Sequence, residues 1–472
     1  MILETMKRLI ILLFVLVPAM SWAQLDSIPV IGWFARNMSD VDPNYIQPSG
    51  YHLSVRLLNN YNQEEMRMNF DDGTKVTVRS PLTPSIGLGV SFDGLGYNYS
   101  VKLKKKQLAT GTKKTEVSFS SSTQMFSISA HYRHTGGDFR LKKMVLPGLG
   151  DITHPDNDLA VKFTDDYDSY HNLNVGDECG IKMFDININY NWNHRKYSAP
   201  ASTSFSNQQK RSAGSLITGV GVANYDVDNT FGDWQSEAVL LQAFSAYGKD
   251  AFRTMLTSLF TDPEARASYG QKKCSSIRFT DVQANIGYAY NWVPTPHLML
   301  SAKLTLSPSL KICKGDNENN HFIRNTRLIA YGKGSEKLTA MNALQDYMVE
   351  MYPTILKNAE LSTDESKRLI DAITLLVNGT EIGGEHRTAY DDLRYSFRKN
   401  VFDVNYALHL SGVWNMDRWY AGTKFALQHY RYHSGLYCKF DNLFYNFNVT
   451  LGYRFLEKKK KTISPFSLET TD

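Results

Sequence analysis

The sequence predicts an antiparallel transmembrane β-barrel of about 12 strands, with a helical insertion in an extracellular loop. Two observations lead to this prediction. Apolar and polar residues alternate with period two in many stretches, and the connections between those stretches tend to alternate between short and long. Alternation turns one face of each strand toward lipid and the other toward the lumen. Short turns on one side and long loops on the other are typical of outer-membrane barrels.

Residues 1–23 have the pattern of an export signal peptide. Lys7 and Arg8 precede an apolar run over residues 9–17, and Ser21-Trp22-Ala23 forms a small-x-small cleavage site. The run is shorter than the roughly 20 residues that a membrane-spanning helix needs, which disfavours the alternative of a transmembrane anchor. We expect the mature chain to begin at Gln24, with residues 24–48 as a periplasmic segment.

Twelve stretches within residues 49–456 show the strand pattern, and together they form the predicted barrel. The clearest cover residues 184–192, 282–292, 298–307 and 402–414, where large apolar residues alternate with Asn, Gln, Ser, Thr and Lys. The remaining stretches are 53–57, 86–92, 97–103, 126–132, 139–144, 216–222, 419–427 and 445–455.

The connections set the predicted orientation. Residues 93–95, 134–137, 293–296 and 415–417 are short, whereas 105–123, 147–177, 226–276 and 315–400 are long. Short turns are periplasmic in such barrels, so both termini are expected in the periplasm. The connection over residues 194–213 does not fit, because it is too long for a tight turn.

Aromatic residues gather at the predicted periplasmic ends of the strands. Their rings are apolar while their N–H or O–H groups reach water, which suits a membrane interface. The residues are Trp192, Trp292, Trp414, Trp419, Tyr453 and Phe455.

Two of the long loops have helical patterns. Within the insertion at 315–400, residues of about 335–378 predict two amphipathic helices, with capping-box spacing between Ser362 and Glu365 and a stop at Asn378-Gly379. The insertion at 226–276 has a further helical pattern over residues 236–266. Such an insertion would be a helical cap or a folded-in plug, or an excursion with no role beyond packing.

The last strand predicts how the barrel closes. Its lipid face would carry Tyr445, Phe447, Val449, Leu451, Tyr453 and Phe455. We expect it to pair with the strand near Leu53 and to be the part of the chain that the barrel-assembly machinery binds. Residues 457–472 would be a charged periplasmic tail, because the bilayer core does not accommodate a lysine run.

Charged residues on the inward faces are candidate pore-lining groups, and most are basic. A basic lumen raises the local concentration of anionic solutes. A barrel of about 12 strands lies between filled and open-channel sizes, so both a narrow pore and a plugged barrel agree with the pattern. The candidates are Arg56, Lys102, Arg133, Asp185, Lys303, Asp403, Lys424 and Arg454.

The four cysteines of an exported chain suggest disulfides. Cys274 and Cys313 come out nearly opposite each other across two predicted strands, so they are the candidate pair. The alternative is that all four cysteines are free. We expect no metal site, because no Cys-x-x-Cys pair is present.

We expect no catalytic residue and no cofactor. The chain has no Gly-x-Ser-x-Gly elbow and no His-Glu-x-x-His motif. Some outer-membrane barrels hydrolyse lipids, and the candidates here would be His52, His131, His409 and His429. The first three point inward among polar residues. No basic patch interleaved with aromatics indicates a nucleic-acid partner. A mean hydropathy of −0.36 excludes a helical membrane bundle.

The segment KYSAPASTSFSNQQKRSAGSLITGVG, residues 196–221, resembles a characteristic segment of the domain of unknown function 4421 family. The similarity extends more loosely from SIGLGVSFDGLGYNYSV through IGYAYNWV to the final strand. The resemblance implies an exported outer-membrane barrel of a Gram-negative bacterium. It implies no activity, substrate or catalytic residue.

These observations favour a passive role: a porin-like pore for a small solute, or a surface barrel that binds a ligand. Outer-membrane lipid would be its immediate environment. The alternatives from other classes are a membrane-embedded lipid-modifying enzyme and a soluble periplasmic β-domain.

Overall fold

A computed structural model describes most of the chain between residues 41 and 457. The described ranges are 41–70, 73–92, 95–102, 113–137, 139–146, 150–151, 153, 179–229, 262–271, 274–343, 380–382, 385–433 and 438–457. The predicted signal peptide, the charged tail beyond 457 and residues 344–379 lie outside them. Within the described ranges, no helix is long and apolar enough to cross a membrane.

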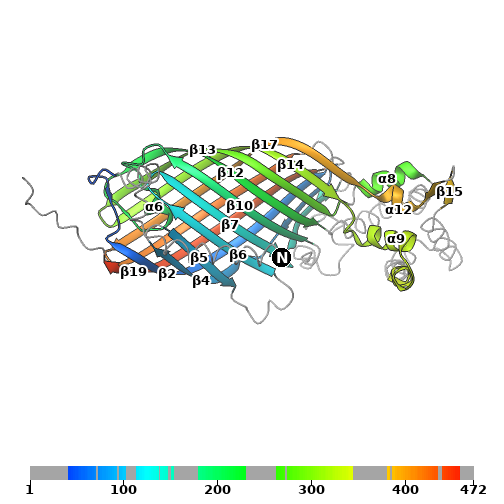
Figure 1. Cartoon of the computed structure of the whole chain (residues 1–472), viewed down its shortest axis with the longest axis horizontal. Coiled ribbons are helices and arrows are strands. Elements are labelled where there is room, and N and C mark those ends of the chain that lie inside the picture. The colour runs from blue at the N-terminus through cyan, green and yellow to red at the C-terminus, as the bar shows by residue number, and fades with distance from the viewer. Residues whose placement is uncertain are drawn as a thin grey trace, which may run out of the picture.

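Twelve of the described strands follow one another by antiparallel pairing and return to the first (Figure 1). The ring closes where β19 pairs with β2, from Cys438 opposite Phe70 to Glu457 opposite Tyr51. The predicted antiparallel transmembrane β-barrel is confirmed. Its strands are β2 (Tyr51–Phe70), β4 (Thr83–Phe92), β5 (Leu95–Lys102), β6 (Lys113–Ser122), β7 (Phe126–Gly136), β10 (Cys179–Asn191), β12 (Ala213–Asn229), β13 (Ser276–Thr295), β14 (Leu298–Asp316), β17 (Ser396–Met416), β18 (Trp419–His433) and β19 (Cys438–Glu457).

The two ends of the barrel differ. At one end β2 begins, β19 ends, and short turns join β13 to β14 and β17 to β18; we call this the turn end. At the other, the loop end, the connections from β12 to β13 and from β14 to β17 carry the helices seen at the right of Figure 1.

Two of the predicted strand assignments are wrong. Residues 105–123, expected as a loop, contain β6, whose sequence has only Val117 and Phe119 as large apolar residues and therefore gives a weak signal. Residues 139–144, expected in the barrel wall, fall mainly in β8 (Arg140–Leu146), which pairs with β3 (Lys75–Arg79) and β9 (Gly150–Asp151) and is not one of the twelve wall strands. As a result, residues 134–137 lie at the loop end instead of the turn end.

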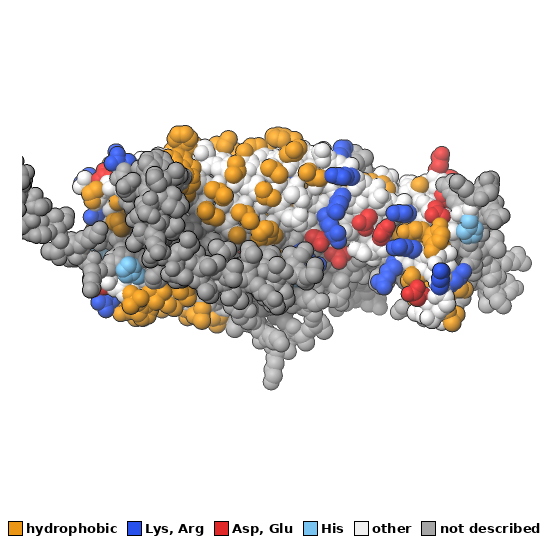
Figure 2. Space-filling model, in the orientation of Figure 1, with side chains coloured by type: hydrophobic (Ala, Val, Ile, Leu, Met, Phe, Trp, Pro, Cys, Tyr) orange, Lys and Arg blue, Asp and Glu red, His pale blue; other side chains and the backbone are white. Residues whose placement is uncertain are grey.

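The outer wall of the barrel is apolar, as the alternation predicts. Val282, Leu304 and Leu451 are about half exposed, at 53%, 50% and 49%, whereas the inward Asn191 and Asn291 are buried. Figure 2 shows hydrophobic side chains scattered over the middle of the wall and charged ones toward the loop end. Exposed apolar side chains on a closed sheet are the surface that a bilayer covers.

The lumen at the loop end is filled by an apolar core. Because β3 replaces β4 as the partner of β2 beyond Asn62, it branches from the wall and carries β8 with it. The side chains of these two strands pack with inward residues from the opposite wall. The cluster includes Val76, Val78, Leu141, Met144, Ile181, Tyr225, Phe279, Tyr432 and Phe440. Rings of Tyr225, Phe279 and Tyr432 stack at centroid distances of 4.6 and 5.8 Å.

Beyond the loop end, α8 (Pro263–Gln271), α9 (His321–Tyr331) and α12 (Ala389–Leu393) pack together near the hairpin of β15 (Thr380–Ile382) and β16 (Glu385–Arg387) (Figure 1). Arg266 Nε and Nη2 donate to Asp392 Oδ2 at 2.8 and 2.6 Å. Asn317 Nδ2 donates to the carbonyls of Gly270 and Leu393. In the predicted helical region, residues 335–343 are helical and 344–378 lie outside the described residues.

The lipid face of β19 is tested by Leu451→Arg. A cation at the membrane midplane on this face costs about 2–4 kcal/mol, so we expect a lower yield of barrel with heat-modifiable migration in detergent. Leu451→Phe is the matched control and should assemble normally. Equal assembly of both variants would contradict the assignment of this face.

Candidate functional site in the lumen

The connection between β10 and β12, residues 192–212, folds into the turn end of the lumen; we call it the plug. It contains α6 (Ala199–Thr203) and β11 (Gln208–Gln209), and β11 pairs with β1 (Ile46–Gln47). The short α6 contacts both β6 and β17, which are on opposite sides of the ring. A helix that touches both must cross the lumen. This explains why the connection is too long for a turn.

Local sequence determines where α6 begins and ends. The side chain of Ser198 caps the helix by accepting from Ala201 N at 3.3 Å, and Pro200 is in the first turn, where its missing N–H costs nothing. After Ser204, Phe205 has a φ of 57°, the left-handed conformation that commonly follows a helix.

Three basic side chains bind the carbonyls at the C-terminal end of α6. Lys424 from β18 donates to Thr203 O. Arg56 from β2 donates to Ser204 O at 3.1 Å, and Arg454 from β19 donates to Phe205 O at 2.7 Å. The last carbonyls of a helix have no partner within it and carry partial negative charge. The barrel wall therefore supplies the cap that this helix lacks.

Ring packing holds the same end of the plug. Phe205 is buried against Tyr420, with ring centroids 5.9 Å apart. A Cβ at Gly422 would lie 2.5 Å from the Phe205 ring, so only glycine permits this approach. The Lys424 ammonium lies 4.5 Å from the Phe205 centroid, and the Arg454 guanidinium lies 4.7 Å from that of Tyr420.

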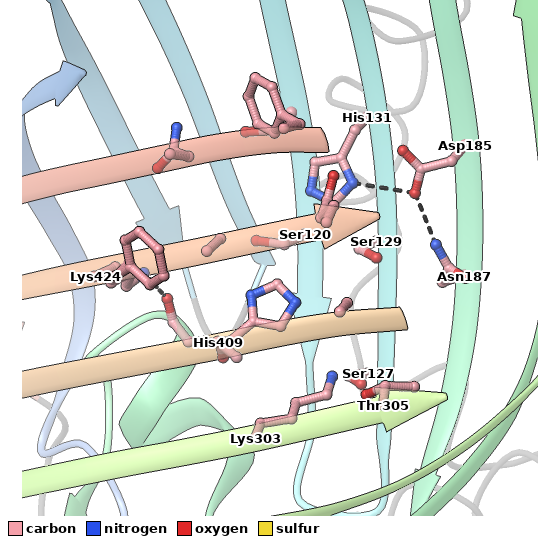
Figure 3. A pocket seen from close by; sticks show the side chains of 18 of the residues that line it. Ser120, Ser127, Ser129, His131, Asp185, Asn187, Lys303, Thr305, His409 and Lys424 are labelled. Atoms are coloured by element: carbon pink, nitrogen blue, oxygen red, sulfur yellow. Dashed lines mark hydrogen bonds and ion pairs between the residues drawn. The ribbon is translucent and has the colours of Figure 1, made fainter. Parts of the chain in front are cut away.

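Between the plug and the apolar core lies a cavity of about 350 Å³, which we call the chamber. Four basic side chains, Arg56, Arg133, Lys303 and Lys424, and two carboxylates, Glu116 and Asp185, line it. Figure 3 shows Lys303, His409, Lys424 and His131 together around this space. Most of the other lining groups are hydroxyls and amides, including Ser118, Ser120, Ser127, Ser129, Asn187, Asn189 and Asn285.

Both chamber carboxylates are already bound. Asp185 Oδ2 lies 3.3 Å from His131 Nδ1 and accepts from Asn187 Nδ2 at 2.7 Å (Figure 3). Glu116 Oε2 accepts from Asn62 Nδ2 at 2.5 Å. In the described part of the chain, neither carboxylate forms an ion pair with Lys303 or Lys424.

Lys303 and His409 are direct cross-strand partners on β14 and β17, and both line the chamber. Such partners place their Cβ atoms about 4.5–5.5 Å apart. Within the described residues, neither side chain has a hydrogen-bond partner. Lys424 lies on the next strand, where it is opposite Ser411, two residues after His409.

A layer of buried charges separates the chamber from the apolar core. Lys311 and Asp281 are fully buried and form an ion pair, and Asn405 contacts both, at 3.1 Å from Lys311 Nζ and 3.0 Å from Asp281 Oδ2. Nearby, Glu64 Oε1 accepts from Arg133 and from Asn442, each at 3.1 Å.

Five of the eight predicted pore-lining residues line the chamber: Arg56, Arg133, Asp185, Lys303 and Lys424. Arg454 lies at the plug instead. Asp403 lies closer to the loop end, where its Oδ2 accepts from His433 N at 3.1 Å. The side chain of Lys102 lies outside the described residues. Of the histidines considered for catalysis, His131, His409 and His429 line the chamber and His52 does not.

The predicted disulfide is not formed. Cys274 and Cys313 are both buried thiols that are not joined to each other, and Cys179 is also buried. The register of β13 and β14 places Phe279 opposite Cys313, and Cys274 lies five residues before Phe279 in the chain. The Cys274 thiol donates instead to the carbonyls of Ser276 and Asp316, at 3.5 Å each.

Sequence reasoning missed several interior charges, chiefly Glu64, Asp281 and Lys311. The signal for Lys311 was present: apolar Leu306, Pro308, Leu310 and Ile312 continue to alternate with Ser307, Ser309 and Lys311. The predicted strand ended too early at residue 307, whereas β14 continues to Asp316. The described residues contain no group of His, Cys, Asp and Glu side chains that could hold a metal ion.

Residues 40–342 match a protein family described as "Domain of unknown function (DUF4421)". No curated protein matches the chain significantly.

Among solved structures, the chain is similar to the outer membrane protease OmpT from Escherichia coli, at 8% identity and a TM-score of 0.33, covering 87% of this chain and 98% of that one. It is also similar to the Pseudomonas putida toluene transporter TodX, at 6% identity and a TM-score of 0.24, covering 86% of this chain and 91% of that one. A third similar structure is the translocator domain of the autotransporter NalP from Neisseria meningitidis, at 8% identity and a TM-score of 0.28, covering 85% of this chain and 88% of that one. At these identities and TM-scores, the similarities do not indicate a function for this chain.

The charge layer is tested by Lys311→Met. Leaving Asp281 buried without its cation should destabilise the barrel by about 3–5 kcal/mol, measured as the free energy of unfolding by urea in lipid vesicles. The double variant Lys311→Met/Asp281→Leu should recover most of that loss, because no unpaired charge remains. Additive losses would show that the two residues act independently.

Proposed function

Because the chain belongs to the family of domains of unknown function DUF4421, whose description assigns no activity, we propose a role from the lumen itself. The proposed function is that of an outer-membrane barrel with a solute pathway that is closed at rest by the plug. The observation that carries it is the capping of α6 by Arg56, Lys424 and Arg454 from three different strands.

The plug is the element that would open. It is one connection of 21 residues, attached to the wall by hydrogen bonds and ring contacts and by no covalent link other than its own two ends. The apolar core, by contrast, contains side chains from at least six strands and excludes water. Opening at the turn end would connect the chamber with solvent at the lower cost, and the branch of β3 and β8 would have to move for passage through the loop end.

The proposal includes the location and the neighbours of the protein. The signal peptide would export the chain, the turn end with both termini would face the periplasm, and assembly would depend on the barrel-assembly machinery acting on β19. Membrane lipid would cover the exposed apolar wall, where Val282 and Leu451 are about half exposed.

We propose that the protein is not an enzyme that modifies lipid. Of the histidines considered for such chemistry, His131, His409 and His429 line the chamber, whereas lipid meets the opposite face of the same strands. His131 contacts Asp185 Oδ2 inside the lumen, on the face of the wall that lipid does not reach. We expect the His131→Gln variant to have the same phospholipid turnover as the wild-type protein.

Single-channel conductance in planar bilayers tests the closed pathway. We expect infrequent openings for the wild-type protein and frequent ones for Arg56→Gln/Arg454→Gln. A hydrogen bond to a charged group contributes about 1.5–3 kcal/mol, and the double variant weakens two at the plug.

The matched control is Lys314→Gln, which removes one exposed cation from the outer face of β14 and should conduct like wild type. A wild-type barrel that is steadily open would contradict the proposal. So would a double variant that opens no more often than the control.

A further inference from the structure

The chamber has uncompensated positive charge. The ammonium group of Lys303, which is partly exposed to the chamber, has no hydrogen-bond partner among the described residues. Its cross-strand partner His409 also has none. Two adjacent donors on one wall that are both without acceptors indicate that something else binds them.

Among the described residues, no carboxylate pairs with these donors. Asp185 is bound by His131 and Asn187, and Glu116 by Asn62, as described above. Arg133 is neutralised by Glu64 across the charge layer at 3.1 Å. Lys424 has a backbone carbonyl as its acceptor, which leaves its charge uncompensated. An anion from solution would complete the site at Lys303 and His409.

The other lining residues indicate what the uncharged part of that anion would be. Serine hydroxyls from β6 and β7 and amide groups from β10 and β13 line the chamber, and both kinds of group bind hydroxyls well. The volume of about 350 Å³ is at the lower end of the range of small-molecule sites, which is about 300–1,000 Å³. A single hydroxylated ring with one anionic group fits these limits.

We infer that the chamber binds a small polyhydroxylated anion, such as a phosphorylated or acidic monosaccharide, with its anionic group at Lys303 and His409. Hydroxyl groups of the ligand would lie against the serine and asparagine side chains. The inference names the class of solute for the proposed pathway and rests on that pathway for the entry of the ligand.

Equilibrium dialysis of the detergent-solubilised barrel tests this site, with prolonged incubation to allow entry. Glucose 6-phosphate and glucuronate are the probes for the two anionic groups, and glucose is the neutral control. We expect saturable binding of at least one of the anions, no detectable binding of glucose, and displacement of the bound anion by inorganic phosphate. Binding of glucose as strong as that of the anions would overturn the inference, as would failure of both anions to bind.

Two variants place the site. Lys303→Gln and His409→Gln should each weaken binding by about tenfold or more, because a charged or imidazole donor is lost. Lys314→Gln, on the outer face of the same strand as Lys303, should bind like wild type. Undiminished binding by both chamber variants would overturn the site, and heat-modifiable migration would confirm that each is folded. Lys424 is not used here, because it also binds the plug.

This experiment is independent of conductance. Binding without any effect of Arg56→Gln/Arg454→Gln on openings would support the site and contradict the plugged pathway. Frequent openings in that variant without binding of either anion would support the plugged pathway and contradict the anion site.

Discussion

In a bilayer, every backbone N–H and C=O must find its partner within the protein, because hydrocarbon offers none. Pairing of β19 with β2 meets this requirement by leaving no open edge in the ring. The rest of the structure depends on it. A ring of twelve strands encloses more space than its own inward side chains fill, since barrels of about eight strands are already at that limit. Other parts of the chain therefore occupy the lumen.

Those parts differ in chemistry according to where they lie. At the loop end, β3 and β8 contribute apolar side chains to a water-excluding core. At the turn end, the plug brings a helix terminus, whose carbonyls need donors just as those of the wall do. Arg56, Lys424 and Arg454 meet that need. Inward cations near the turn end are therefore structural, whereas Lys303 and His409, deeper in the lumen, remain available to a ligand.

Much of the wall was predictable because lipid imposes period two on its strands. The alternation of β13, β14, β17 and β19 located the lipid face residue by residue, and it placed Lys303 and Lys424 in the lumen. β6 was missed because Val117 and Phe119 are its only large apolar residues, which weakens the contrast that alternation requires. β8 was misplaced because a strand inside the lumen has the same local pattern as one in the wall.

The plug shows the limit of local pattern. The length of the connection over residues 194–213 was recognisable as anomalous, and its segment carries the family resemblance. Its place in the lumen depends on contacts with strands far away in sequence, such as Arg56 and Arg454. Whether Cys274 lies opposite Cys313 depends likewise on the register between β13 and β14. That register cannot be read from composition or from the spacing of the cysteines.

The position of the plug is the central claim, and a cross-link measures it directly. Thr203 Oγ1 in α6 lies 3.3 Å from Ser122 Oγ at the end of β6. With Thr203→Cys and Ser122→Cys together, a disulfide should form under mild oxidation in the assembled barrel, detected by a change in migration that reductant reverses. A barrel with normal heat-modifiable migration in which both engineered thiols stay reduced, and react with a water-soluble maleimide, would contradict the account.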